Sequence, residues 1–286
     1  RIVYVSEKMI NFEEKFPHDI DNRYKGRVKR VTIKETFDGH TQLSYRLYDK
    51  SGKLCEYIDE LGSKNKFEYN SQNQCIRTTC YMGDSVFSVW EYTFNSKGNL
   101  IQATHTCDGE LSMKKEFEYN RKGEKIKEII FNFKVQALDE NDNWVQGSKE
   151  IRNYEYDSHG NEIRQYGTRG EYRTKIRYSD NGLIDWEENF VDGELHSETF
   201  YYYDNNGRLT REETTQYQYG GGVFSRDYSY DFEGNCVLED YTNRDNGGYS
   251  VKRIFDFYGN CIGERVYHKG ISTYYRETLS QIEYYD

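Results

Sequence analysis

Aromatic and polar residues alternate along most of this chain, and the alternation recurs at nearly regular intervals. Nine segments begin with an aromatic anchor, usually followed by a small polar residue, with Gly or Asn four places after the anchor. The anchors are Tyr48, Tyr69, Phe94, Tyr119, Tyr156, Tyr178, Tyr203, Tyr230 and Phe255, at spacings of 21, 25, 25, 37, 22, 25, 27 and 25 residues. This periodicity indicates a repeat architecture.

The residues around each anchor have the two-residue period of a β-strand. A second aromatic residue stands two places before most anchors, as Phe67, Tyr92 and Tyr154 do, and Glu, Lys or Thr falls between the pair. Alternate residues of a strand point to opposite faces, so the aromatic residues share one face. The single proline of the chain, Pro17, is consistent with long uninterrupted strands.

The segment after each anchor predicts a tight hairpin turn of the form D-x-x-G. The clearest copies read YDKSGKL from Tyr48 and YDNNGRL from Tyr203. An Asp or Asn after the anchor can accept backbone N–H groups of its own turn, and a glycine supplies the positive φ that closes the turn. These glycines are Gly52, Gly98, Gly123, Gly160, Gly182, Gly207, Gly234 and Gly259, with Asn73 in the remaining copy.

The fold class predicted from this pattern is all-β, with tandem antiparallel β-hairpin repeats forming a long, curled or spiralling sheet, repeat-like or solenoid-like. Nine repeats give about 18 strands, and open sheets rarely exceed about 10 before they curl or split. We therefore expect a spiral, a superhelix or a partial barrel. A tenth copy is interpreted as cut off at Tyr285-Asp286.

The repeats divide the chain into two regions. Residues 1–43 fit the pattern poorly and are predicted to form an N-terminal capping region, while residues 44–286 form the repeat array. About a dozen extra residues between the Tyr119 and Tyr156 copies predict an inserted long hairpin near 131–150. Because the chain begins at Arg1 rather than Met, we interpret it as a trimmed or processed product.

The repeat segments resemble the YD-repeat (RHS-type) family from Tyr48 to Ile262. The stretch from Asp180 to Asp204 is also similar to MORN-type repeats found in some bacterial antitoxins. The first resemblance implies β-strips that coil into shells or filaments, mostly in bacteria and mostly at or outside the cell surface. It also implies carbohydrate binding or the carriage of toxins, which are the roles described for members of that family.

Composition and charge narrow the classes of partner. Only 35% of the residues are hydrophobic while 16% are aromatic, which suits a thin, half-solvated sheet of tyrosines rather than a thick aliphatic core. The 39 basic and 49 acidic residues give a net charge of −10, so nucleic acid is not an expected partner. No apolar stretch approaches the roughly 20 residues of a spanning helix, so we expect no membrane insertion by this segment.

The sequence offers no catalytic or cofactor motif, and we predict no enzyme activity, no cofactor and no metal. The six histidines are scattered, and the acidic residues follow the turns and the polar face. The stretch from Asp139 to Asn143 has oxygen ligands of the kind that calcium prefers, but its spacing is not that of an EF-hand.

The six cysteines are predicted to stay reduced. Cys75, Cys236 and Cys261 take the core position that leucines occupy in other repeats. Equivalent positions in adjacent repeats lie two strands apart, about 9–10 Å. That separation exceeds the roughly 7 Å limit on the Cα distance in a disulfide.

The candidate binding residues are aromatic and acidic side chains outside the regular pattern. Trp144, Asp139 and Asp142 lie on the inserted hairpin, and Trp186 lies in a strand that departs from the repeat pattern. Flat aromatic rings can stack on sugars or anchor a protein partner.

The leading hypothesis is a non-catalytic binding or scaffolding repeat protein, at the bacterial cell envelope or secreted, that binds carbohydrate or a protein partner. The alternative is an immunity or antitoxin protein, cytoplasmic in that case, which neutralises a basic toxin by direct binding. A third hypothesis, an enzyme that uses acidic residues, would show turnover and a pH optimum.

Overall fold

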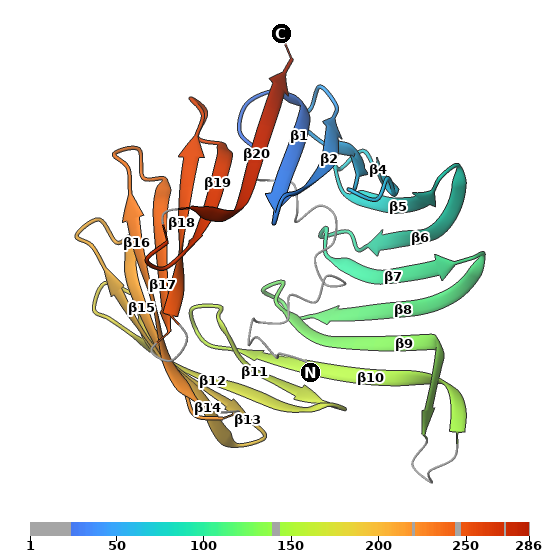
Figure 1. Cartoon of the computed structure of the whole chain (residues 1–286). Coiled ribbons are helices and arrows are strands. Elements are labelled where there is room, and N and C mark those ends of the chain that lie inside the picture. The colour runs from blue at the N-terminus through green and yellow to red at the C-terminus, as the bar shows by residue number, and fades with distance from the viewer. Residues whose placement is uncertain (1–23, 139–143, 219–220, 244–246, 272, 286) are drawn as a thin grey trace.

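The protein forms one sheet of 20 antiparallel strands and no helix in the part of the chain that its computed structural model describes (Figure 1). The described residues are 24–138, 144–218, 221–243, 247–271 and 273–285, with side chains omitted for 135–138 and 144–146. The strands are β1 Val28–Phe37, β2 His40–Tyr48, β3 Leu54–Ile58, β4 Lys64–Tyr69, β5 Cys75–Met82, β6 Ser85–Phe94, β7 Leu100–Cys107, β8 Glu110–Tyr119, β9 Lys125–Leu138, β10 Trp144–Tyr156, β11 Glu162–Gly167, β12 Gly170–Tyr178, β13 Ile184–Val191, β14 Glu194–Tyr203, β15 Leu209–Gln216, β16 Gly222–Tyr230, β17 Cys236–Asn243, β18 Gly247–Phe255, β19 Cys261–His268 and β20 Tyr274–Tyr284.

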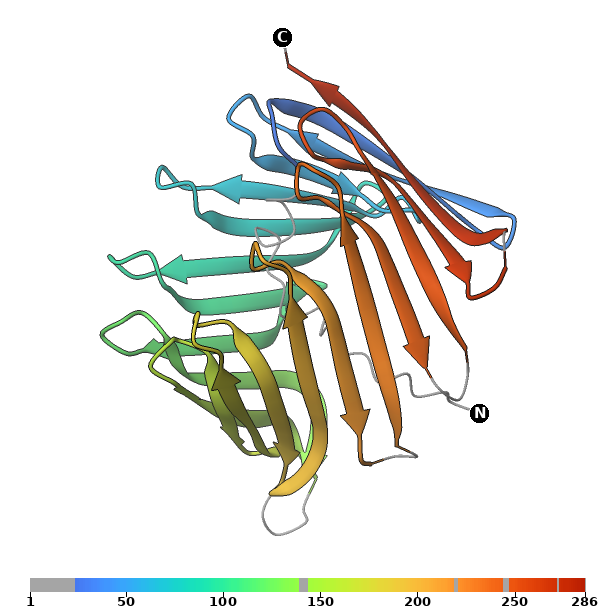
Figure 2. The ribbon, with the colours of Figure 1, turned by 90° about the vertical axis from the view of Figure 1, so that its left-hand side faces the viewer.

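The sheet closes on itself. Each strand pairs with its neighbours in the chain, and β1 also pairs with β20. The prediction of an all-β fold of antiparallel hairpins is confirmed, but the open, spiralling and solenoid-like sheet is wrong. The described strands form a closed 20-stranded antiparallel barrel, shown in Figure 1 and, turned by 90°, in Figure 2.

One rim of the barrel carries the D-x-x-G turns, which have the predicted geometry. In the first of them, the Asp49 carboxylate accepts the backbone N–H groups of Ser51 at 2.8 Å and Lys53 at 3.1 Å. The Gly52 N–H donates to the Asp49 carbonyl at 3.0 Å, with a φ of 85° at Gly52. Asn73, the one replacement for glycine, has a φ of 65°.

The anchor tyrosines join consecutive repeats at this rim. Strands β3 and β4 stop pairing at Glu56 and Lys66, so the carbonyl of Leu54 lies beyond the end of their ladder. The Tyr69 hydroxyl donates to that carbonyl at 2.8 Å. The same bond, at 2.7–2.8 Å, runs from Tyr119 to Leu100, Tyr156 to Lys125, Tyr203 to Ile184 and Tyr230 to Leu209.

The barrel closes through a tenth repeat that is divided between the two ends of the described chain. Tyr284 pairs with Val28 across β20 and β1, in the same bulged register in which Tyr48 pairs with Leu54. The Tyr285 N–H donates to the Arg27 carbonyl at 2.7 Å, as the Asp49 N–H does to Lys53 at 2.9 Å. Gly26, with a φ of 90°, takes the place of the turn glycine.

Asn260 ties this divided turn to the ninth one. It is fully buried, its Oδ1 accepts the Lys25 N–H at 2.5 Å, and its Nδ2 donates to the Lys25 carbonyl at 2.9 Å. The same Nδ2 donates to the Tyr284 hydroxyl at 2.9 Å. Strand β1 and the start of β2, which lie outside the predicted array, thus belong to the same sheet as the repeats. The sequence pattern did not reveal this because the closing turn is not a continuous motif.

The anchor tyrosines lie on the inner face of the barrel, and so does the core. The strand pairings place every buried hydrophobic residue on the same face as the anchors, where side chains converge toward the interior. These residues are Val28, Val31, Tyr48, Leu54, Cys75, Tyr92, Ala103, Phe117, Ile130, Tyr154, Val251 and Val266. No disulfide joins any of the six cysteines, as predicted, and burial raises the pKa of the Cys75 thiol. Among the described residues, no helix is long and apolar enough to cross a membrane.

Replacing Asn260 should weaken the closure of the barrel specifically. In Asn260→Ala the Lys25 amide and carbonyl lose their partner, and the Tyr284 hydroxyl loses a donor, so we expect the free energy of unfolding to fall by about 1–3 kcal/mol. Asn235→Ala is the matched control, because Asn235 holds the same position in the preceding turn and its Nδ2 bonds only to Asp231, at 2.9 Å. Urea unfolding measures both variants, and an equal loss in the two would contradict the role of Asn260 in closure.

The turn aspartates should make the fold acid-sensitive. Burial raises the pKa of Asp49, but hydrogen bonds from Ser51 and Lys53 outweigh it and leave the pKa below 3.8. The backbone N–H of Arg208 chiefly lowers the pKa of Asp204. A lowered folded-state pKa adds stability above pH 3.8, and this is lost as the pH falls through the folded pKa.

An Asp49→Asn/Asp204→Asn double variant should therefore lose less stability than the wild type between pH 6 and about pH 3. Asn70, Asn95 and Asn120 already occupy this position in three other turns, so the turns should still form. Thermal unfolding midpoints at both pH values test this, and parallel pH curves for the two proteins would refute it.

Candidate functional site

A row of alternating charges crosses seven adjacent strands on the inner face. Each of β15 to β20 and then β1 contributes one residue, carboxylate and guanidinium in turn: Glu212, Arg226, Glu239, Arg253, Glu264, Arg276 and Glu35. We call this set the ion ladder. Successive N–O distances are 2.8, 3.8, 2.9, 3.0, 3.3 and 3.9 Å.

The ladder keeps its cations charged. Burial acts to lower the pKa of Arg226, but the hydrogen bond to Glu212 and the neighbouring negative charges outweigh it and raise the pKa. The same balance, with Glu239 and Glu264 as partners, raises the pKa of Arg253. The ladder therefore offers fixed donors and acceptors on a half-buried surface, where such groups interact more strongly than in bulk water.

A row of aromatic rings runs beside the ion ladder on the same face, displaced along the strands. The Phe224 and Tyr241 ring centroids are 6.1 Å apart, and those of Tyr241 and Tyr249 are 4.9 Å apart, with interplanar angles of 22° and 24°. On the next strands His268 stacks on Tyr275 at 4.2 Å. The Arg226 guanidinium lies 5.6 Å from the centre of the Tyr241 ring, so the two rows are in contact.

A hollow of about 130 Å³ lies where the two rows begin, between β15, β16 and β17. Its lining combines the Phe224 and Tyr241 rings with the charged groups of Glu212 and Arg226 and the amide of Gln216. Convergent polar groups beside aromatic surface are the usual lining of a small-molecule site. The inner face of β15–β17 is therefore the candidate functional site.

A second charged cluster, on β8–β10, serves the fold. Glu128 is 2% exposed; its carboxylate accepts the Tyr154 hydroxyl at 2.8 Å and pairs with Lys125 at 3.3 Å and Lys115 at 3.7 Å. Burial acts to raise the pKa of Glu128, but these cations and the hydroxyl outweigh burial and lower the pKa below its usual value. The carboxylate therefore stays ionised. With its oxygens occupied, this group stabilises the interior rather than presenting a reactive face.

The residues singled out from the sequence lie elsewhere. Trp144 begins β10, but its side chain is outside the described residues, as are Asp139 and Asp142 entirely. Trp186 lies in β13 on the outer face, where its indole Nε1 donates to Glu198 at 2.8 Å and the Arg177 guanidinium lies 5.5 Å from its ring centre. A binding role for these residues stays a prediction.

The ion ladder was missed, although its signal was in the sequence. Glutamate stands five places after the turn glycine at Glu212, Glu239 and Glu264, and arginine stands in the strands before the anchors Tyr230 and Phe255, as Arg226 and Arg253. Comparing one position across the repeats would have revealed it. Within the described residues, no group of three or more His, Cys, Asp and Glu side chains could hold a metal ion.

Comparisons with known proteins give no family for the chain. No family model matches it, and no curated protein matches it.

Similar solved structures are remote in sequence. The pore form of the Photorhabdus luminescens Tc holotoxin aligns with a TM-score of 0.28 and 11% identity over 87% of this chain and 18% of that one. A crystal structure of TcdB2–TccC3 aligns at 0.26 with 12% identity, covering 87% and 19%. A porin-like protein from Bacteroides uniformis aligns at 0.35 with 12% identity, covering 91% and 99%. The chain thus spans less than a fifth of the toxin chains, 18% and 19% of their lengths.

Breaking the ion ladder should cost stability at neutral pH. Arg253→Met leaves Glu239 and Glu264 without their shared cation on a half-buried surface, so we expect a loss of about 1–3 kcal/mol in urea unfolding. Arg211→Met is the control, since Arg211 bridges Glu213 and Asp227 on the more exposed outer face. Exposed pairs contribute about 0–1 kcal/mol. A larger loss in the control would contradict the structural weight given to the ladder.

Proposed function

We propose that this chain is a non-catalytic binding protein built of YD-type repeats, and that it binds carbohydrate on the inner face of β15–β17. The observation that carries the proposal is the juxtaposition of two rows in one hollow. Phe224 and Tyr241 supply ring faces, and Glu212 and Arg226 supply charged hydrogen-bonding groups beside them.

The chemistry of a sugar ring matches this arrangement. A pyranose has apolar C–H surfaces, which pack against aromatic rings, and a rim of hydroxyl groups, each of which can donate and accept hydrogen bonds. Carboxylates accept such bonds and guanidiniums donate them, and charge-assisted bonds are stronger than neutral ones. A repeated row of rings and charges would suit a chain of sugars better than a single residue.

Two earlier expectations remain hypotheses beside this proposal. A protein partner, including a toxin neutralised by an immunity protein, would use a larger and flatter surface than the hollow between β15 and β17. A location at or outside the bacterial cell surface also stays a prediction, because it rests on the resemblance of the repeats alone.

A glycan-array screen with a matched pair of variants tests the proposal. Tyr241→Ala removes a ring from the hollow and should weaken binding to the recognised glycan at least ~10-fold, the cost of losing a central aromatic contact. Tyr202→Ala removes a ring from the outer face, where Tyr202 is 45% exposed, and should leave binding unchanged.

The same screen weighs the competing hypotheses. Trp144→Ala should leave binding at the inner-face site unchanged. Loss of binding in Trp144→Ala but not in Tyr241→Ala would move the site to the inserted hairpin. An array on which the wild-type protein binds no glycan would overturn the carbohydrate proposal. A pull-down for a basic protein partner, followed by measurement of its salt dependence, would then test the immunity hypothesis.

A further inference from the structure

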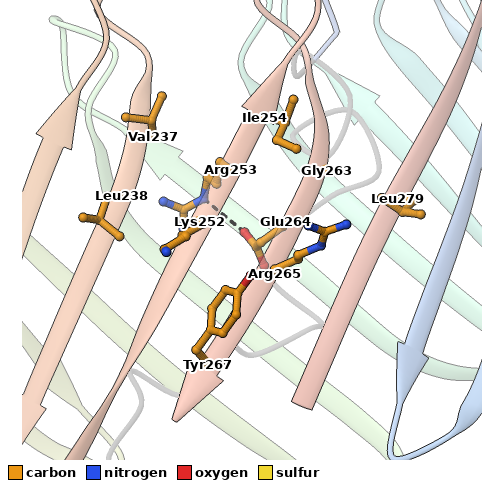
Figure 3. A pocket seen from close by; sticks show the side chains of 10 residues that line it. All are labelled: Val237, Leu238, Lys252, Arg253, Ile254, Gly263, Glu264, Arg265, Tyr267 and Leu279. Atoms are coloured by element: carbon orange, nitrogen blue, oxygen red, sulfur yellow. Dashed lines mark hydrogen bonds and ion pairs between the residues drawn. The ribbon is translucent and has the colours of Figure 1, made fainter. Parts of the chain in front are cut away.

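The outer face of β17–β20 has a hollow of about 420 Å³, larger than the one inside (Figure 3). Leu238, Ile254 and Leu279 line it, and Gly263 lies between the last two. Ile254 is 54% exposed and Leu279 is 38% exposed, so apolar surface faces solvent here. The volume lies within the range of sites that hold a ligand or a partner's side chain.

Gly263 keeps this hollow open although its backbone does not require glycine. Its φ is not in the left-handed region, and an added Cβ would lie 3.6 Å from Ile254 and from Leu279, an ordinary contact distance. The residues at the same place in the other eight repeats, opposite the residue before the anchor, all have longer side chains. They are Glu56, Arg77, Gln102, Lys127, Arg164, Trp186, Arg211 and Leu238. A glycine inside a strand marks a bulge, a bend or a place where a ligand or another backbone approaches closely.

Two exposed phenylalanines lie in turns that lead into strands lining the hollow. Phe232 lies in the turn between β16 and β17, and Phe257 lies in the turn between β18 and β19. Each side chain is 95% exposed. Most turns in this rim carry polar residues at these places, such as Lys50-Ser51 and Asn205-Asn206. Ile254 is the last residue of β18 but one, and Phe257 follows in the turn, so the projections lie at the rim next to the hollow and form one patch with it.

The patch also contains one cation and one anion, neither of which forms an ion pair among the described residues. Lys252, at the edge of the hollow, lies 5.2 Å from the Tyr267 ring centre, and no carboxylate among the described residues forms an ion pair with it. Glu233, next to Phe232, is exposed and likewise pairs with no described cation. The patch thus holds an apolar projection beside a carboxylate, and an apolar hollow beside an ammonium group.

We propose that a second copy of this chain covers the patch about a two-fold axis. Phe232 of each copy enters the hollow of the other, and Glu233 of each pairs with Lys252 of the other. A two-fold interface needs a surface that complements itself, and this patch contains both halves of each contact. Exposed apolar patches of this kind commonly mark protein–protein contacts.

Sedimentation velocity of the full chain across ~1–100 μM tests the association, and we expect a reversible dimer in this range. Phe232→Ser should weaken it at least ~10-fold, since an anchor in a pocket dominates such interfaces. Gly263→Leu should weaken it similarly by filling the hollow. Leu61→Ser is the control, because Leu61 is 85% exposed on a turn at the opposite rim, and it should leave the dimer intact.

A charge exchange tests the two-fold geometry itself. Lys252→Glu and Glu233→Lys should each weaken the dimer, because each places like charges opposite one another. The double variant restores opposite charges at both contacts and should restore association. Thermal unfolding of each variant at a concentration where the wild type is monomeric shows whether the fold is retained.

Each of three results would overturn the proposal: a wild-type chain that stays monomeric to ~100 μM, a dimer that Phe232→Ser and Gly263→Leu leave unchanged, or a charge exchange that does not rescue. Should Gly263→Leu fail to fold, Gly263→Ala provides the test. Its Cβ meets only ordinary contacts, so the variant should fold and associate more weakly in proportion to the smaller volume filled.

Discussion

The hydrogen bond that joins one repeat to the next, from an anchor tyrosine to the carbonyl that follows the preceding turn, recurs at five of the nine anchors. Neighbouring repeats stop pairing short of the rim, which leaves a carbonyl such as that of Leu54 without a backbone donor. The Tyr69 hydroxyl reaches this carbonyl at 2.8 Å while its ring fills the space between the diverging strands. A phenylalanine could fill that space but could not satisfy the carbonyl, and an unpaired buried carbonyl costs about 1–3 kcal/mol. Where the anchor is a tyrosine that makes this bond, it therefore links one repeat to the next at the rim.

The same interaction explains what the sequence could and could not predict. The turns and strands depend on residues close together in the sequence, so Asp49, Gly52 and their equivalents predict a turn in each repeat. Closure is not local. Its turn is assembled from Tyr284 and Tyr285 at one end of the chain and Gly26 at the other, and neither half resembles a complete repeat. Only the pairing of β1 with β20 brings these residues together. An open strip of nine repeats would expose two edge strands with unpaired backbone groups, and closure removes both edges.

The ion ladder of the candidate site was not predicted from the sequence for a different reason. The ion ladder consists of one residue per strand, so no window of the sequence contains more than a fragment of it. Its members become visible only when one position is followed from repeat to repeat, as with Glu212, Glu239 and Glu264. The outer hollow likewise depends on comparison across repeats, because Gly263 is unusual only beside residues such as Arg211 and Leu238. In a repeat protein the departures from the repeated pattern carry the information about specific sites.

Stability alone does not account for the ion ladder. Strands β6–β8 fill equivalent inner positions with apolar groups, where Tyr92, Ala103 and Phe117 form a buried cluster. Ala103 occupies the repeat position of Glu239, and Phe117 that of Arg253. Replacing buried ion pairs with packed hydrophobic residues is often neutral or stabilising, so a fold that already uses the apolar solution gains little stability from charges. The half-buried charges of β15–β20 and β1 instead hold a fixed geometry in contact with the aromatic row, and the proposed carbohydrate site rests on that contact.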